Sequence, residues 1–283
     1  MVVEYFNEFD VERIPRRYIR NIENPFEKYN DSTFLKRYRF PKLIVIDQLL
    51  NLLGINYANN RGLPIPPILQ LLTTLRFYAT ANFQTICGDL RGIDQSTVSR
   101  IIKRVSHEIA SRFRDHVKFP QTEAEWTVIR QQFFEIAGIP GVGGCIDCTH
   151  IRIQNPGGIN GEVFRNRYAC KPYIFTPLLN PVTNAEKNYN KAHIKTRNIV
   201  ERVFGVWKRK FPCLRRGLAN SPNTIVSIIV ACAVLYNISL KLRLPEFAVE
   251  DETVEEVNHF VNDENREIIG AAARRAYIIR HFT

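Results

Sequence analysis

The sequence predicts an α/β protein in which a helical N-terminal region, residues 1–138, is followed by a second domain, residues 139–283. Three observations lead to this fold class. Apolar residues recur at helical spacing through the first region, a short apolar run follows two glycines at residues 143–156, and a long helical pattern covers about 184–211. The run at residues 143–156 reads GGCIDCTHIRIQNP, which is typical of a β-strand and marks the start of the second domain.

Helix starts in the N-terminal region are predicted from capping residues and prolines. Asp31 or Ser32 is the expected cap of a first helix, and the prolines of PPILQLLTTLRFYAT stand where a helix tolerates a missing N–H. Thr122 and Glu125 have the spacing of a capping box at the start of a later helix. These signals indicate a series of amphipathic helices around an apolar core.

Residues 83–109 have the pattern of a helix-turn-helix. A short helix over 83–89 and a turn at Gly92 precede a second helix, Thr97 to Ile109, for which Ser96 is the expected cap. The second helix of such a motif enters the major groove of DNA. The alternative is a structural hairpin whose basic residues face water. The candidate residues for phosphate or base contact are Thr97, Ser99, Arg100, Lys103 and Arg104.

A formal net charge of +11 over 283 residues predicts a polyanionic partner, most often nucleic acid. The six cysteines lack the spacing of a disulfide framework, and the N-terminus lacks the apolar core of a signal peptide. A reducing, intracellular compartment is therefore expected. The apolar run from Thr224 to Leu240 is too short for a membrane span and contains polar residues, so we expect a buried core helix and no membrane contact.

A basic cluster near the end of the long helix has three possible roles. Lys208, Arg209 and Lys210 form a candidate DNA-contacting face, a nuclear-import patch or a solvated helix face. We expect the DNA-contacting role, with the protein in the nucleus and an additional pool in the cytoplasm.

Asp147 lies in the middle of the predicted strand. Because side chains alternate along a strand, Asp147, Thr149 and Ile151 are expected on one face. A buried carboxylate is costly unless it is paired, hydrogen-bonded or bound to a metal. Asp147 is therefore either a strand-end residue that accepts backbone N–H groups or a metal ligand.

The long helix carries a second carboxylate, Glu201. His193, Arg197 and Glu201 follow one another at four-residue spacing and lie on one helix face. Residues 190–216 contain nine Lys or Arg and Glu201 as their single acid. This acid is either the partner of Arg197 or Arg202 in an ordinary helix ion pair, or a ligand for a divalent metal beside a nucleic-acid backbone.

Two-metal phosphodiester cleavage requires clustered carboxylates. These hold two ions about 3.5–4 Å apart, one beside the attacking water and one beside the leaving oxygen. Asp147 and Glu201 suit the first and last acids of such a site, and oxygen ligands of this kind favour Mg²⁺ or Mn²⁺.

Several stretches resemble the PIF/Harbinger transposase-derived nucleases of animals, over nearly the whole chain. They are GDLRGIDQSTVSRIIKRV, GGCIDCTHIRIQNP, EVFRNR and TPLLNPVTNAEKNYNKAHIKTRNIVERVFGVWKRKFPCL. The resemblance implies a ribonuclease-H-like catalytic domain with a D-D-E metal site, DNA as substrate and a separate Myb-like DNA-binding partner. By motif, Asp147 is the first acid and Glu201 the last. His193 and Arg197 are implied to face the substrate phosphate or to orient a carboxylate.

The chain departs from the family pattern at the middle acid. No Asp occurs between Asp147 and Glu201, where the family has its second Asp. The sequence FRNR runs directly into YACKPYIFTPLLNP, which indicates an internal deletion between Arg167 and Tyr168 that removes strands as well as a ligand. We therefore expect a DDE endonuclease that lacks some sheet strands and has impaired activity. The alternative is a non-catalytic protein that binds DNA or a partner.

Overall fold

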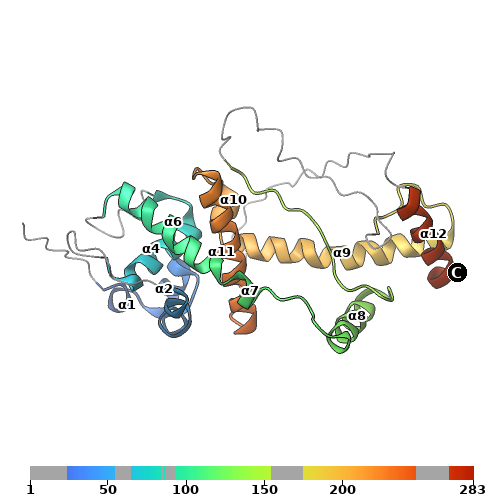
Figure 1. Cartoon of the computed structure of the whole chain (residues 1–283), viewed down its shortest axis with the longest axis horizontal. Helices are drawn as coiled ribbons and strands as arrows, with labels where there is room; N and C mark the ends of the chain where they lie inside the picture. The colour runs from blue at the N-terminus through green and yellow to red at the C-terminus, as the bar shows by residue number, and fades with distance from the viewer. Residues whose placement is uncertain (1–23, 55–64, 84–85, 87–92, 154–174, 247–267) are drawn as a thin grey trace, which may run out of the picture.

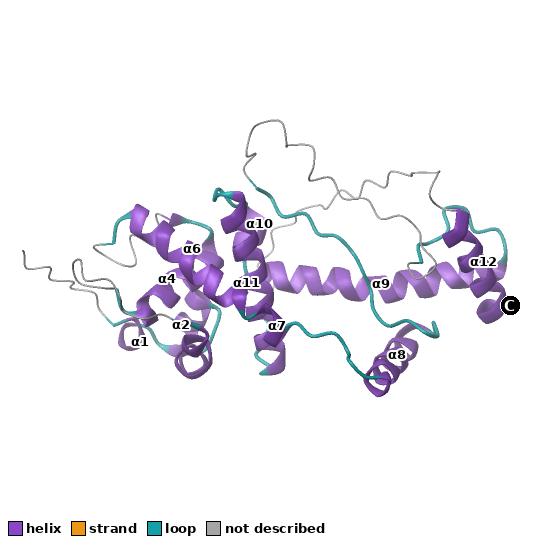
Figure 2. Cartoon of the chain, in the orientation of Figure 1, coloured by secondary structure: helices purple, strands orange, loops and turns teal. Residues whose placement is uncertain are grey.

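A computed structural model describes residues 24–54, 65–83, 86, 93–153, 175–246 and 268–283. In this part of the chain the protein is helical, and none of its elements is a β-strand (Figure 2). The elements are α1 (Pro25–Lys28), α2 (Asp31–Tyr38), α3 (Lys42–Ile44), η1 (Val45–Leu49), η2 (Leu50–Leu52), α4 (Pro67–Thr80), α6 (Gln95–Ser111), α7 (Phe113–His116), α8 (Glu123–Ala137), α9 (Asn184–Lys210), α10 (Cys213–Arg216), α11 (Pro222–Lys241) and α12 (Ile268–Phe282).

The helices form a body at one end of an elongated molecule. α1, α2, α4, α6, α10 and α11 gather there, and α9 extends from them as a long rod (Figure 1). α8 packs beside α9, and α12 packs against α9 near its N-terminal end (Figure 1). The long helix therefore connects the body to the part of the molecule that carries the candidate site.

The hydrophobic core joins helices from both ends of the sequence. α6 packs against α4 on one side and α11 on the other. Val98, Ile102 and Val105 of α6 are fully buried, as are Ile228 and Leu235 of α11. Since α11 follows residue 139, the predicted division at residue 138 does not separate two cores in the described part of the chain.

α11 is the one helix in the described ranges that is long and apolar enough to cross a membrane, judged by length and composition alone. Its Ile228, Ala231, Cys232, Val234 and Leu235 are buried, and its main packing partner is α6. This packing fits the core helix predicted from the sequence.

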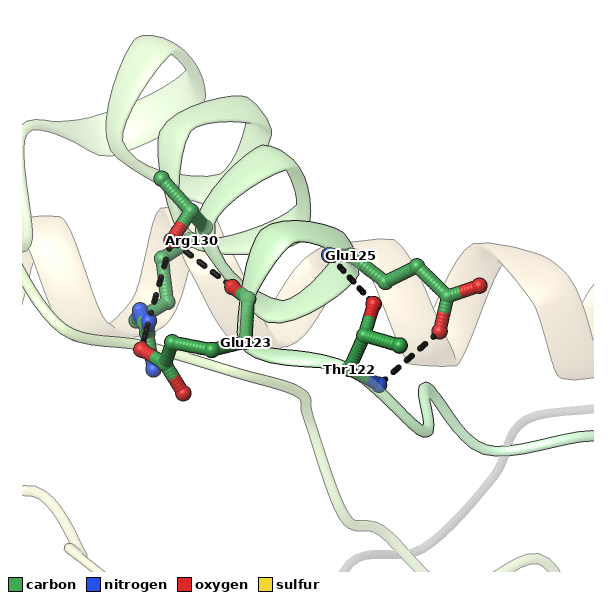
Figure 3. A network of polar contacts seen from close by, with 5 residues as sticks. Thr122, Glu123, Glu125 and Arg130 are labelled. Atoms are coloured by element: carbon green, nitrogen blue, oxygen red, sulfur yellow. Dashed lines mark hydrogen bonds and ion pairs between the residues drawn. The ribbon is translucent and has the colours of Figure 1, made fainter.

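Polar caps fix the starts of several helices. At α8 the Thr122 hydroxyl accepts a hydrogen bond from the Glu125 N–H at 3.3 Å, and the Glu125 carboxylate accepts one from the Thr122 N–H at 3.2 Å (Figure 3). This is the predicted capping box. The cap of α2 is Asn30, whose side chain accepts a 2.8 Å hydrogen bond from the Thr33 N–H, so the prediction of Asp31 or Ser32 is wrong.

The second helix of the predicted helix-turn-helix is present as α6. Its cap is Asp94 and not Ser96, because the Asp94 carboxylate accepts a hydrogen bond from the Thr97 N–H at 2.8 Å. Hydrogen bonds from Ser96 and then from Thr97 lower the pKa of Asp94 to about 2. Most of the predicted first helix, including residues 84–85 and 87–89, lies outside the described residues, and the motif stays a prediction.

The predicted strand at residues 143–156 is not a strand over its described part, residues 143–153. Its one β-type pairing there is an isolated parallel bridge between Ile153 and Leu218, in which the Leu218 N–H donates to the Arg152 carbonyl at 2.9 Å. Ile146 is 63% exposed, so the segment is not buried. A strand needs a neighbour for its backbone hydrogen bonds, and the described segments supply none beyond this bridge. The ribonuclease-H-like sheet stays a prediction.

A buried hydrogen bond between α4 and α6 gives a test of the core. The Tyr78 hydroxyl and the Ser106 hydroxyl are 2.7 Å apart and both side chains are fully buried. We expect Tyr78→Phe to lower the free energy of unfolding by about 1–2 kcal/mol, since a buried hydroxyl loses its partner. Urea unfolding measures the change.

The control is Ser111→Ala, which removes an exposed hydroxyl from α6, the helix that carries Ser106. We expect it to lower the free energy of unfolding by less than about 0.5 kcal/mol. In a double-mutant cycle with Ser106→Ala, the two core substitutions should not add. Strict additivity would show that the two hydroxyls do not interact.

Candidate active site

One arginine joins the two predicted acids. The Arg197 Nη2 atom lies 3.2 Å from Oδ2 and 3.3 Å from Oδ1 of Asp147. The same atom lies 3.1 Å from Oε1 of Glu201. Oδ2 of Asp147 and Oε1 of Glu201 are therefore at most 6.3 Å apart, the sum of the two ion-pair distances. The structure thus brings Asp147, Arg197 and Glu201 to one point.

The cluster is partly buried, and its burial falls from Asp147 to Glu201. The side chains are 17% exposed for Asp147, 25% for Arg197 and 42% for Glu201. Asp147 also accepts a 2.9 Å hydrogen bond from the Cys148 N–H. The structure thus shows the non-metal alternatives considered from the sequence: Asp147 accepts a backbone N–H, and Glu201 forms a helix ion pair with Arg197. Arg197 also pairs with Asp147 and so connects the two acids.

The N-terminal half of α9 is held by the segment that precedes it. A capping box formed by Thr183 and Glu186 starts the helix. One turn further on, the Asn190 side chain accepts from the Leu178 N–H at 2.9 Å and donates to the Leu178 carbonyl at 2.8 Å. These contacts fix the rotation of α9 and so fix the face on which Arg197 and Glu201 lie.

His193 supports the site through the backbone. Its Nε2 lies 3.0 Å from the Phe175 carbonyl oxygen, so Nε2 carries the proton that this contact requires. Burial lowers the pKa of His193, the contact with Phe175 opposes this effect, and nearby Arg197 and Arg274 lower the pKa further. The contact joins His193 to a backbone carbonyl and to neither carboxylate, so both roles implied for His193 stay predictions.

The C-terminal helix fastens the segments around the site, a feature that the sequence motifs did not predict. Arg274 Nη1 donates to the Thr176 carbonyl at 3.0 Å and to the Thr176 hydroxyl at 2.7 Å. The Tyr277 hydroxyl donates to the Pro140 carbonyl, and the Tyr277 ring lies 5.1 Å from the ring of Phe175. α12 therefore touches both the segment that leads to Asp147 and the segment that holds His193.

The predicted DNA-contacting residues of α6 lie mainly at the surface. Ser99, Arg100, Lys103 and Arg104 are exposed, and Thr97 is half-buried beside the Asp94 cap. Arg104 nevertheless donates a hydrogen bond to Gln70 of α4.

The basic cluster at the end of α9 differs from its prediction. Lys208 is 8% exposed and Lys210 is 5% exposed, because the last turn of α9 packs into the helical body. The Lys210 ammonium lies 4.6 Å from the centre of the Phe40 ring, and burial together with Arg39 lowers its pKa to about 8. The expected DNA-facing role is therefore not supported for these two lysines, while Arg209 is half-buried.

The donor set does not fit a two-ion site. Within the described ranges, no group of three or more His, Cys, Asp or Glu residues is placed to hold a metal. Asp147 and Glu201 supply carboxylate oxygens of the kind that Mg²⁺ and Mn²⁺ prefer, but a guanidinium lies between them. These two acids suit one weakly held ion at most.

The environment of His193 predicts a pH dependence of stability. Because its pKa is lowered in the folded protein, the unfolded chain binds a proton more readily. The free energy of unfolding should therefore fall as the pH drops below about 6.5, the ordinary histidine value, and His193→Asn should reduce this loss. Urea unfolding between about pH 5 and pH 8 measures both slopes.

The control for this prediction is His150→Asn, which replaces an exposed ring on the Asp147 segment and should keep the wild-type slope. An unchanged slope in His193→Asn would show that this histidine does not couple protonation to folding.

Comparison with known families gives a match in the C-terminal half. Residues 165–237 match the DDE superfamily endonuclease family. The matched range includes His193, Arg197 and Glu201 and begins after Asp147.

Similar proteins cover most of the chain. The human protein named "Putative nuclease HARBI1" is 26% identical, over 89% of this chain and 91% of its own length. Its counterpart from Bos taurus is 27% identical with the same coverage. A shorter similarity, 30% identity over 36% of this chain and 24% of the relative, links it to "Protein ALP1-like" of Arabidopsis thaliana. No solved structure matches the chain.

The alignment with the human relative is longer than this chain. It spans 322 positions, whereas 89% of 283 residues is about 252, so about 70 aligned positions have no residue here. The resemblance predicted from the sequence motifs is confirmed: residues 165–237 match the DDE superfamily endonuclease family, and about nine-tenths of the chain is similar to the Harbinger transposase-derived proteins named "Putative nuclease HARBI1".

Proposed function

We propose that this chain is a DNA endonuclease derived from a Harbinger-type transposase, dependent on Mg²⁺ or Mn²⁺, whose activity is impaired. The observation that carries the proposal is the convergence of Asp147 and Glu201 on Arg197. The two acids come from separate segments and meet on one face of α9, as the first and last acids of a D-D-E site must. Arg197 lies where a shared cation would bind.

Phosphodiester hydrolysis at this site would use Asp147 and Glu201 as the metal-holding residues. A bound divalent ion supplies an activated water and stabilises the charge on the leaving oxygen. Arg197 reduces the negative charge available for such an ion, and it is also a suitable donor to a substrate phosphate if it swings away from the acids. His193, held by the Phe175 carbonyl, keeps the helix face in place.

The impairment follows from the missing middle acid. No Asp stands between Asp147 and Glu201, and about 70 positions of the human relative's alignment have no counterpart in this chain. Both observations support the proposed deletion between Arg167 and Tyr168. Positioning and charge stabilisation supply most of the rate in such sites, so losing one ligand removes orders of magnitude of activity.

A second function, DNA binding without catalysis, is favoured by one observation. α6 exposes Ser99, Arg100 and Lys103 on the side away from its buried apolar face, as the recognition helix of a helix-turn-helix does. In this second proposal the protein still binds DNA, has a Myb-like protein as its partner and is located in the nucleus. Only the nuclease proposal requires the ribonuclease-H-like catalytic domain.

A nicking assay tests the nuclease proposal. Supercoiled plasmid is incubated with the full chain in Mg²⁺ or Mn²⁺, and the fraction of nicked product is measured over time. We expect the wild type to show a low, metal-dependent rate, because the acids cannot fix two ions at catalytic spacing, and Glu201→Gln to show a still lower rate, because it loses one of the two metal-holding carboxylates. Glu135→Gln, an exposed acid on α8, is the matched control. Rapid cleavage that Glu201→Gln alone abolishes would contradict the proposed impairment.

Removing the bridging arginine tests whether the two acids can share an ion. Arg197→Ala leaves two partly buried carboxylates without their cation, and we expect a loss of about 1–2 kcal/mol in unfolding free energy. A divalent ion at ten times its dissociation constant should restore about 1.4 kcal/mol to this variant and less to the wild type.

Thermal unfolding with and without Mn²⁺ measures the effect of removing Arg197. Arg130→Ala breaks the Arg130–Glu123 ion pair on α8 and serves as the control, which should gain nothing specific from the ion. Equal responses of Arg197→Ala and Arg130→Ala to Mn²⁺ would show that Asp147 and Glu201 do not form a shared cation site.

A further inference from the structure

The exposed face of α9 carries a row of basic side chains that none of the predicted sites includes. We call this row the α9 basic stripe, and its members are Lys187, Lys191, Lys195 and Arg202. At 3.6 residues per turn these four positions fall within an arc of about 80°. All four side chains are exposed, while Tyr189, Ala192 and Thr196 on the opposite face are buried.

The α9 basic stripe runs beside the candidate active site. Glu201 lies about 40° around the helix from the Lys187 edge of the stripe and is 42% exposed, so its carboxylate lies beside the stripe. From Lys187 to Arg202 the helix rises about 22 Å, at 1.5 Å per residue. The stripe ends there, because the next lysines along α9, Lys208 and Lys210, are buried.

The like charges of the stripe are not neutralised within the described part of the protein. Lys187, Lys191 and Lys195 follow one another at four-residue spacing, at which like charges repel and destabilise the helix. No carboxylate of another described residue pairs with them, whereas Lys42 pairs with Asp31 on α2. The one acid on this part of α9, Glu201, is engaged by Arg197.

We propose that the α9 basic stripe binds the phosphate backbone of double-stranded DNA and guides it to Glu201. This inference rests on the proposed function, because it assigns the substrate path of the same site. A duplex carries one charge per about 1.7 Å of axis, both strands counted, so the length of duplex that matches a stripe of about 22 Å carries about 13 phosphate charges, of which those on the near side face the stripe. Lysine side chains at helical spacing contact phosphates without reading bases, so the binding is independent of sequence.

Salt-dependent DNA binding by the full chain tests this proposal without requiring cleavage. Fluorescence anisotropy with a labelled 30-bp duplex in EDTA gives the association constant at several salt concentrations. The variant Lys187→Gln/Lys191→Gln/Lys195→Gln removes three phosphate contacts. We expect its log–log salt slope to be shallower by about 2.7 and its affinity at 0.1 M salt to fall roughly 100-fold.

The matched control is Lys36→Gln/Lys118→Gln/Lys241→Gln, which removes the same charge from three exposed lysines elsewhere. It should keep a slope within about one unit of the wild type. Circular dichroism and thermal unfolding check that both variants are folded, and the stripe variant should be no less stable because it loses like-charge repulsion.

Three outcomes would overturn the inference. They are equal slopes for the stripe variant and the control, no binding by the wild type at low salt, and loss of slope only in Arg100→Gln/Lys103→Gln, which would place the DNA on α6. Because the assay contains no divalent metal, a failed stripe is distinguishable from a failed nuclease site, which the nicking assay reports separately.

Discussion

The contact of Arg197 with two carboxylates organises the half of the molecule that lies outside the helical body. Arg197 and Asp147 are 50 residues apart in sequence, and their ion pair fastens an irregular segment to the long helix. Without the guanidinium, the acids that the family resemblance pairs would repel one another. The same charge that joins them also reduces their capacity to bind a metal ion, so one residue links structure and proposed chemistry.

The packing around α9 explains why the site is positioned without a sheet in the described residues. At one end, the last turn of α9 is buried in the core formed by α4, α6 and α11. At the other end, α12 and the segment around Thr176 contact the helix and each other. α9 is therefore fixed at both ends, and its middle, which carries Arg197 and Glu201, is presented on a rigid rod.

Sequence reasoning succeeded where the signal was local. The capping box of Thr122 and Glu125 and the apolar character of α11 each follow from residues close together in the chain. The N-cap residues of α2 and α6 were predicted wrongly. Asn30 and Asp94 are the caps, but polar residues of equally suitable type follow each of them within two positions, and the sequence alone does not distinguish them. The prediction of a strand at residues 143–156 was wrong over the described residues 143–153, because β-structure depends on a distant partner that local composition does not reveal.

The site shows the same division between local and distant information. Four-residue spacing predicted that Arg197 and Glu201 share a face, and the family motifs paired Asp147 with Glu201, whereas the burial of Lys208 and Lys210 depends on tertiary packing. The contributions of Arg274 and Tyr277 depend on a helix nearly 80 residues beyond Arg197, and no periodic pattern indicates them.

The position of α12 has a consequence for the order in which the protein assembles. α12 follows every other described element in the chain, yet it contacts Pro140 and Thr176, which the ribosome delivers much earlier. The helical body needs α11 but not α12, so it can collapse while translation continues. The segments around Asp147 and His193 gain these contacts only after α12 has been synthesised. A chain that stopped before Ile268 would keep Asp147 and Glu201 but would lose the contacts of Arg274 with Thr176 and of Tyr277 with Pro140.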